Sequence, residues 1–243
     1  MIELCDVVKD VGRGRMRKRV LNGIDWTIPT RTQFVILGQA ASGKTTLLHI
    51  LSGLKVATNG IVRRRGSICS PAGIGSLGPG LTARQLATRA ARLYHCDPQT
   101  IIDFTSEITQ LGHLINVPLP WLTAPVRQRI QFSLRYAIPF DCYVFDGAIG
   151  IKGADTLKIY RELYDLRSRE ASMIVATRQP AFARTFDAYG GVLYQGRLSI
   201  FKTVEEAVLM YEGLPKVETN NQTVFQTEIP DDESDNAMWD MLA

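Results

Sequence analysis

Hydrophobic residues along this chain form short continuous runs that alternate with segments of helical spacing. Residues 34–37 and 142–145 are apolar throughout, and runs of this length favour buried strands. Residues 46–54 and 127–138 place apolar side chains three and four positions apart, which predicts amphipathic helices. Strand and helix patterns alternate in this way along most of the chain, so the sequence predicts an α/β fold.

Local signals predict three further elements between these segments. A basic strand is predicted around residues 60–68. Thr82 and Gln85 have the spacing of a capping box, which starts a helix that runs through Tyr94. A predominantly polar helical stretch then follows from Pro98 to Gly112.

The segment between the strand at 34–37 and the helix at 46–54 fits the phosphate-binding pattern G-x-x-x-x-G-K-[ST] at every fixed position. In such a loop, backbone N–H groups and the positive end of the helix dipole surround a β-phosphate, and Lys44 reaches the β- and γ-phosphates. The Thr45 hydroxyl can ligate Mg²⁺, so the expected ligand is a nucleoside triphosphate with magnesium. The alternative is a chance glycine-rich turn. The predicted nucleotide-binding residues are Gly38, Gln39, Ala40, Ala41, Ser42, Gly43, Lys44, Thr45 and Thr46.

A second element of a phosphate site is predicted where the apolar run at 142–145 ends in Asp146. A carboxylate at the end of such a strand can hold the magnesium shell opposite Thr45. An aspartate at a strand end is weak evidence alone, and the upstream phosphate loop strengthens it. Thr45 and Asp146 are therefore the predicted metal-site residues.

Composition fits one generous α/β domain, because the chain has 243 residues of which 45% are hydrophobic. The sequence has no apolar stretch of the 18 or more residues that would span a bilayer, and its N-terminal segment lacks a signal-peptide profile, so we expect a cytosolic chain. The four cysteines are widely separated and the three histidines show no ligand spacing. Neither a disulfide framework nor a zinc site is indicated.

Charge is distributed unevenly along the chain. From Gly213 to the C-terminus there is one basic residue against seven acidic ones, a net charge of −6. This composition predicts a disordered acidic tail over 213–243, in which residues 238–242 could form a docking peptide. Basic clusters at 13–19 and 63–65 could face anionic lipid or nucleic acid, although short arginine loops are more often solvated turns.

A G-x-G-x-x-G string at residues 73–78 raises the alternative of a dinucleotide-binding fold. In that fold the string opens a helix, whereas here Pro79 and Gly80 follow it at once. The phosphate loop at 38–45 therefore remains the stronger nucleotide signal.

Taken in order, these segments resemble the ATP-binding subunits of ABC transporters, in the branch that exports capsular polysaccharide, polyol phosphate and related glycans. The resemblance covers residues 2 to about 212. Only the phosphate loop is specific by itself, and the order and spacing of the rest complete the resemblance. The other segments that carry it are Ile2–Leu4, Val20–Pro29, Leu81–Gln85, Arg127–Asp146, Gly191–Leu198 and Thr203–Tyr211.

The resemblance implies an α/β P-loop NTPase fold with a mixed sheet and a helical subdomain inserted at roughly 82–138. It assigns residues 1–212 to an ABC-type nucleotide-binding domain, followed by the tail at 213–243. It also implies ATP and Mg²⁺ as cofactors, and a membrane-spanning permease and a second ATP-binding subunit as partners. We expect no nucleic-acid partner. The implied location is the cytoplasmic side of the inner membrane, where the chain would be peripheral.

The chain departs from the family pattern at five places. The carboxylate that polarises the attacking water should follow Asp146, but that position holds Gly147. The switch histidine after the strand at 173–176 is replaced by Arg178. The signature before the helix at 127–138 reads Leu-Thr-Ala-Pro-Val, and its Pro125 removes a backbone donor where glycine would let phosphate approach. Gly78 takes the place of an expected glutamine, and no aromatic residue lies near Val11 to stack on adenine.

These departures predict a subunit that binds Mg-ATP and hydrolyses it poorly by itself, since loss of one group in phosphoryl transfer can cost on the order of 10³ in rate. Two interpretations stay open. One is a transporter subunit paired with a permease. The other is a regulatory or scaffold module that has kept the fold and responds to nucleotide. A small-molecule kinase is a more distant third, because no arginine-rich lid is evident.

Overall fold

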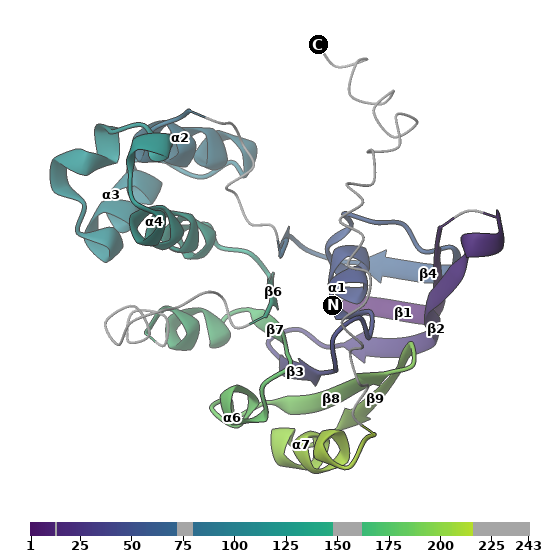
Figure 1. Ribbon diagram of the computed structural model, residues 1–243. Helices are drawn as coiled ribbons and strands as arrows, with labels where there is room; N and C mark the ends of the chain where they lie inside the picture. Colours follow the sequence, from purple (N-terminus) through teal and green to yellow (C-terminus); the bar gives the residue numbers. More distant parts are fainter. Residues whose placement is uncertain (13, 72–79, 148–161, 216–243) are drawn as a thin grey trace.

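A six-stranded mixed sheet forms the centre of the molecule (Figure 1). The computed structural model describes residues 1–12, 14–71, 80–147 and 162–215. Five neighbouring strands run parallel, and the last strand pairs antiparallel with β8. The inner strands are buried almost throughout, as expected of a parallel sheet covered on both faces. In spatial order the strands are β5 (Ile68–Cys69), β6 (Cys142–Asp146), β7 (Ser172–Thr177), β3 (Gln33–Leu37), β8 (Tyr189–Tyr194) and β9 (Arg197–Phe201).

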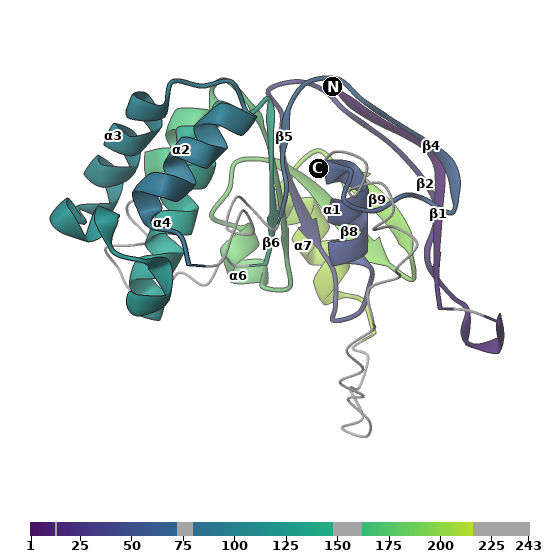
Figure 2. The same ribbon diagram turned by 90° about the horizontal axis from the view of Figure 1, so that it is seen from above.

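A smaller antiparallel sheet has the order β2-β1-β4. Its strands are β1 (Ile2–Val11), β2 (Lys18–Ile28) and β4 (Asn59–Arg64), and a short 3-10 turn at Gly14–Met16 connects the first two. The helix α1 (Lys44–Ser52) lies between the two sheets (Figure 2). Its buried leucines and isoleucine join a core with β1 and β2 on one side and β3, β6 and β7 on the other. The N-terminus of α1 is thereby fixed relative to both sheets.

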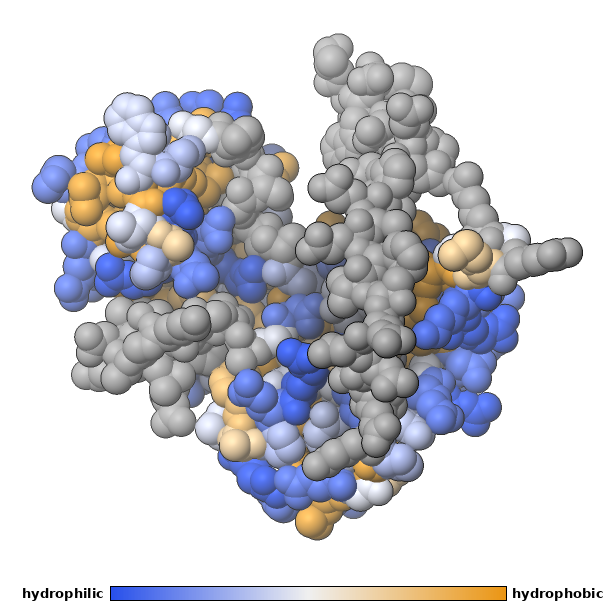
Figure 3. Space-filling view, in the orientation of Figure 1, coloured by the Kyte–Doolittle hydropathy of each residue, from blue (hydrophilic) through white to orange (hydrophobic). Residues whose placement is uncertain are grey.

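The helices α2, α3 and α4 form a lobe beside the β5–β6 edge of the large sheet (Figures 1 and 2). They span Ala83–Leu93, Pro98–Thr109 and Ala124–Ala137. The small buried alanines of α2 let it pack closely against α3, and the second hydrophobic core joins this lobe to the large sheet. Figure 3 shows hydrophobic side chains at the surface of this lobe. The connections contain 3-10 turns at Gly112–Asn116 and Leu119–Trp121.

The remaining described helices follow β6, β7 and β9 along the chain. Residues 162–168 are helical, and α6 (Pro180–Ala183) and α7 (Val204–Glu212) follow β7 and β9. Within the described residues, no helix is long and apolar enough to cross a bilayer.

Most predicted elements are confirmed, with small shifts at their ends. The capping box is present, since Thr82 Oγ1 accepts from the Gln85 backbone N–H at 3.1 Å and the Gln85 side chain accepts from the Thr82 N–H at 3.0 Å. The helix predicted from residue 127 begins earlier, at Ala124, and Pro125 lies in its first turn, where its missing N–H costs nothing.

The single basic strand predicted around 60–68 is wrong. The chain forms β4 in the small sheet, turns, and forms β5 in the large sheet. The turn is set by Gly66, whose φ is +99° and whose added Cβ would lie 2.6 Å from Asp141 Oδ2. The Asp141 carboxylate accepts from the N–H and the hydroxyl of Ser67, which ties the turn to the start of β6.

Several arginines of the two basic clusters have structural partners. Arg64 donates to the carbonyls of Ile50 and Leu51 at the C-terminal end of α1, which satisfies carbonyls that the helix cannot pair itself. Arg17 and Arg19 both form ion pairs with Asp10. Arg13 lies outside the described residues.

The helix α7 packs closely against the large sheet at Gly190. A Cβ at this position would lie 2.4 Å from the Ala207 Cβ and 2.5 Å from the Thr203 carbonyl oxygen. We expect Gly190→Ala to lower the free energy of unfolding by about 1–3 kcal/mol through overpacking. The control is Gly191→Ala, whose Cβ would make ordinary contacts of 3.4 Å or more. Chemical denaturation measures both, and equal losses would contradict the prediction.

Candidate phosphate-binding site

The predicted phosphate loop connects the end of β3 to the start of α1. Two glycines allow its backbone to approach neighbouring strands closely. An added Cβ would lie 2.8 Å from the Leu193 carbonyl oxygen at Gly38, and 3.0 Å from the Val20 carbonyl oxygen at Gly43. Gly43 also has a φ of +101°, which L side chains rarely adopt. The loop therefore requires glycine at these two positions before any ligand is considered.

Lys44 begins α1 and turns its ammonium group back over the loop. Its Nζ donates to the carbonyl oxygens of Gly38 at 2.6 Å and Gln39 at 2.7 Å, and to the Ser42 hydroxyl at 3.2 Å. The residue is only 9% exposed. Burial, opposed by the charge of Asp146 and aided by that of Arg178, lowers the pKa of Lys44 to about 8. An anion placed on the loop would restore the charged form.

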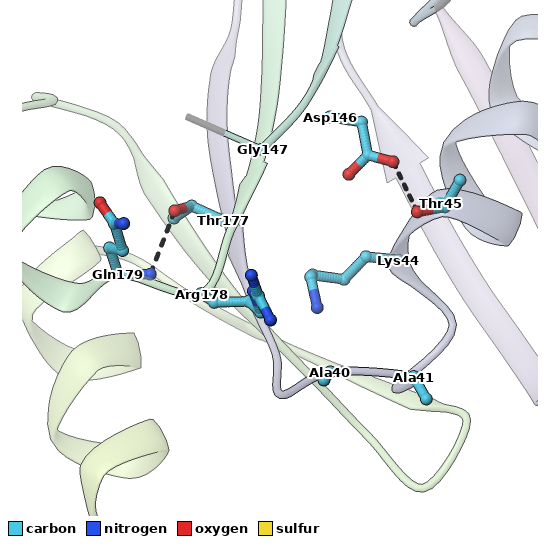
Figure 4. Close-up of a pocket in the computed structure, with 9 residues that line it drawn as sticks. All are labelled: Ala40, Ala41, Lys44, Thr45, Asp146, Gly147, Thr177, Arg178 and Gln179. Atoms are coloured by element: carbon cyan, nitrogen blue, oxygen red, sulfur yellow. Dashed lines mark hydrogen bonds between the residues drawn. The ribbon is translucent and has the colours of Figure 1, made fainter. Parts of the chain in front are cut away.

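The two predicted metal-site residues are brought together. Thr45 Oγ1 donates to Asp146 Oδ2 at 2.5 Å, which joins the first turn of α1 to the end of β6 (Figure 4). A hydroxyl and a carboxylate are hard oxygen donors of the kind that Mg²⁺ prefers, and Mg²⁺ usually takes its other ligands from water and phosphate. The donor set therefore fits magnesium, which would neutralise phosphate charge when bound.

A cavity of about 430 Å³ opens beside these groups. Figure 4 shows Lys44 and Arg178 directed into the same space, across from Asp146. Two cations that converge on one carboxylate leave an excess of positive charge, which an anionic ligand would compensate. The described residues that line this cavity are Ala40, Ala41, Lys44, Thr45, Asp146, Gly147, Thr177, Arg178 and Gln179.

Gly147 occupies the position where the resemblance places a catalytic carboxylate. Its N–H donates to the Ala176 carbonyl at 2.8 Å, so its backbone is fixed to β7. Its φ is +81°, and an added Cβ would meet no atom of the described residues within 4 Å. A side chain would therefore have room, but it would hold the backbone in a strained conformation.

A second cavity, of about 670 Å³, lies on the other side of the loop. It shares Ala40, Ala41, Lys44 and Thr45 with the first cavity. The remaining walls come from the start of β2 and the β8–β9 turn. The full set of described lining residues is Lys18, Arg19, Val20, Gln39, Ala40, Ala41, Ser42, Gly43, Lys44, Thr45, Thr46, Tyr194, Gln195 and Gly196.

The structure also places the other positions that depart from the family pattern. Residues 122–126 lie at the N-terminus of α4 in the helical lobe, and none of them lines either cavity described above. Val11 ends β1 and pairs with Lys18. Gly78, the glycine string at 73–78 and tail residues 216–243 lie outside the described residues.

The sequence did not predict that Thr177 and Gln179 line the first cavity, or that Lys18 and Gly196 line the second. Thr177 and Gln179 could have been found, because ligands bind beyond the carboxyl ends of parallel strands, and β7 lies between β6 and β3. Lys18 and Gly196 carried no such signal, since only the packing of one sheet against the other brings them to the loop.

Comparisons with known proteins agree with this geometry. A family model described as ABC transporter matches residues 21–90. The ATP-binding protein BexA of Haemophilus influenzae is 28% identical, over 89% of this chain and all of BexA. The capsule polysaccharide export ATP-binding protein CtrD of Neisseria meningitidis is also 28% identical, over 82% of this chain and 92% of CtrD.

Solved structures show the same fold. The ATP-binding cassette MJ0796, in a dimeric post-hydrolysis state bound to ADP and Pi, superimposes with a TM-score of 0.72 at 19% identity, covering 84% of this chain and 99% of that one. An ATP-binding subunit of an ABC transporter gives a TM-score of 0.73 at 14% identity, covering 87% and 99%.

The fold is α/β and matches that of ATP-binding cassettes, with a phosphate-loop sequence between β3 and α1. Residues 21–90 of this chain thus match the ABC transporter family model, and relatives at 26–28% identity include ATP-binding proteins of capsule polysaccharide export.

The lowered pKa of Lys44 predicts proton uptake when phosphate binds. Near pH 8.5 most of the free protein carries a neutral Lys44, because its pKa is about 8. Binding to phosphate requires the ammonium form, so affinity should fall about tenfold from pH 7 to pH 9. Calorimetric titration with Mg-ATP in two buffers of different ionisation enthalpy measures the protons taken up. Uptake that is absent at pH 8.5 would contradict the prediction.

Proposed function

We propose that this chain is the ATP-binding subunit of an ABC transporter that exports a polysaccharide or a related glycan. The observation that carries the proposal is the convergence of Lys44, Arg178 and the Thr45–Asp146 pair on one side of the phosphate loop. Two proteins similar to this chain support the choice of cargo class by their names: CtrD, a capsule polysaccharide export ATP-binding protein, and KpsT of Escherichia coli, a polysialic acid transport ATP-binding protein that is 26% identical.

In this proposal Mg-ATP lies along the loop with its β-phosphate under the N-terminus of α1. Backbone N–H groups of residues 38–46 hold the phosphates, and Lys44 exchanges its bonds to loop carbonyls for bonds to phosphate. Thr45 and Asp146 hold the magnesium ion. Arg178 is placed to contact the terminal phosphate, because it faces the same cavity as Lys44 and Asp146.

Hydrolysis by the isolated chain is proposed to be slow. Gly147 offers no side chain to polarise water, and the guanidinium of Arg178 donates hydrogen bonds and accepts none. Such a subunit would keep the groups that bind nucleotide but lack a general base for hydrolysis. It would therefore bind Mg-ATP and hydrolyse it slowly. The partners in this proposal are a membrane-spanning permease and a second ATP-binding subunit, at the inner face of the inner membrane.

The test is to measure Mg-ATP binding and ATPase rate side by side on the purified chain. We expect saturable binding with no turnover above that of Lys44→Ala. The variant itself should bind at least about 100-fold more weakly, because it removes charge-assisted hydrogen bonds to phosphate. Equal affinity in both proteins would refute the assignment of the loop. Turnover that Lys44→Ala abolishes would refute slow hydrolysis.

Gly147→Glu asks whether the missing carboxylate limits turnover. An added side chain has open space, so Mg-ATP affinity should stay unchanged while turnover rises at least about tenfold. The positive φ should lower the free energy of unfolding by roughly 1–2 kcal/mol. Gly147→Gln is the matched control, since it carries the same strain without a base. No difference in turnover between the two variants would show that other positions limit the reaction.

A further inference from the structure

The larger cavity is the place where the nucleoside part of a ligand would lie. The smaller cavity holds the oxygen pair of Thr45 and Asp146 together with Arg178, which suits terminal phosphates and a metal ion. Both cavities share Lys44, so a ligand whose phosphates cross the loop continues into the larger one. The chemistry of that second cavity therefore decides which nucleotides are accepted.

Strand register directs Lys18 to the loop side of the small sheet. Lys18 pairs with Val11 and Leu21 pairs with Lys9, so Lys18 and Leu21 lie on the same face despite the bulge between them. Leu21 contacts the loop, since a Cβ on Gly43 would lie 3.1 Å from its Cδ2. Lys18 therefore faces the loop and lines the cavity.

Arg19, the next residue of β2, also lines the cavity, but its charge is already paired. It pairs with Asp10, whose carboxylate holds the Arg19 guanidinium at 3.0 Å and that of Arg17 at 2.7 Å. The positive charge of Arg19 is therefore already neutralised by Asp10. Lys18 is left as the cation of β2 that can reach a ligand on the loop.

The described residues that line this cavity offer few groups that could recognise a nucleotide base. None of its described lining residues is acidic, and the one aromatic residue among them, Tyr194, is half-buried and packs against the hydrophobic core. The amides of Gln39 and Gln195 donate to the Pro215 carbonyl and to the Tyr194 hydroxyl, at 2.7 and 3.2 Å. A base would meet one half-buried ring, and each of these two amides already donates one hydrogen bond.

We infer that this cavity selects its ligand by phosphate charge, with Lys18 as a second cation beside Lys44, and accepts nucleoside triphosphates without regard to the base. The inference rests on the proposed nucleotide binding and states which nucleotides the site would accept. The ligand class is any ribonucleoside triphosphate, and inorganic tripolyphosphate should retain much of the affinity.

The experiment compares ATP, GTP, UTP and inorganic tripolyphosphate by calorimetry, each with Mg²⁺, on the full chain. Wild-type affinities for the three nucleotides should agree within about threefold. Lys18→Ala should weaken all four ligands by a similar factor, about 2- to 10-fold, and by less at high salt. Lys202→Ala is the matched control, because it removes an equal charge at the opposite end of β9 from the cavity.

A preference for ATP over GTP and UTP of about 30-fold or more would overturn the inference. So would a Lys18→Ala loss confined to the nucleotides, since Lys18 would then contact the nucleoside. Failure of the proposed function looks different, because no ligand would then bind, or Lys44→Ala would bind all four as the wild type does.

A second variant tests where the base lies. Val11 is 38% exposed and stands beside Lys18, so Val11→Tyr would add a ring to that wall. We expect ATP and GTP to gain about fivefold or more in affinity and tripolyphosphate to stay unchanged. Val11→Leu, which adds bulk without a ring, should leave all four alike. Equal nucleotide affinities in both variants would overturn the placement of the nucleoside in this cavity.

Discussion

The site depends on backbone packing around the phosphate loop that only glycine permits. Gly38 lies against the Leu193 carbonyl of β8, and Gly43 lies against the Val20 carbonyl of β2. Gly196, in the β8–β9 turn, approaches the same Val20 carbonyl and accepts a hydrogen bond from the Asn22 N–H at 2.8 Å. Both sheets therefore meet at the loop, and the orientation of its N–H groups is fixed by contacts outside it. Such preorganisation spares a ligand the cost of ordering the loop.

Electrostatics at this junction are unbalanced. Burial depresses the pKa of Lys44, and its ammonium is held by two carbonyls and a hydroxyl while Asp146 is occupied by Thr45. Each of these contacts can be exchanged for a phosphate oxygen or a metal ion. In the free protein, neighbouring protein groups make the hydrogen bonds that a ligand would otherwise make. These bonds limit the free-energy cost of burying the Lys44 cation without an anion.

The sequence was most informative where function restricts the residue type. The loop, the strand ending in Asp146 and the capping box at Thr82 each required particular side chains at fixed spacing, and the structure has all three elements. The strand predicted around 60–68 failed because its division depends on Asp141, more than 70 residues away, which holds the turn at Gly66 and Ser67. Lys18 was missed for the same reason: its position depends on the register of β1 against β2.

In the proposed function, nucleotide binding and hydrolysis separate because they rely on different chemical groups. Binding would need loop N–H groups, Lys44 and two oxygen ligands, and all of these lie around the loop. Turnover also needs a base aimed at water, and Gly147 cannot supply one even though its surroundings leave room for a side chain. Its left-handed backbone makes any other residue there costly, so the glycine suits the local conformation as well as removing the base. A cassette built this way would contribute the free energy of nucleotide binding to a partner and leave the chemical step to another site.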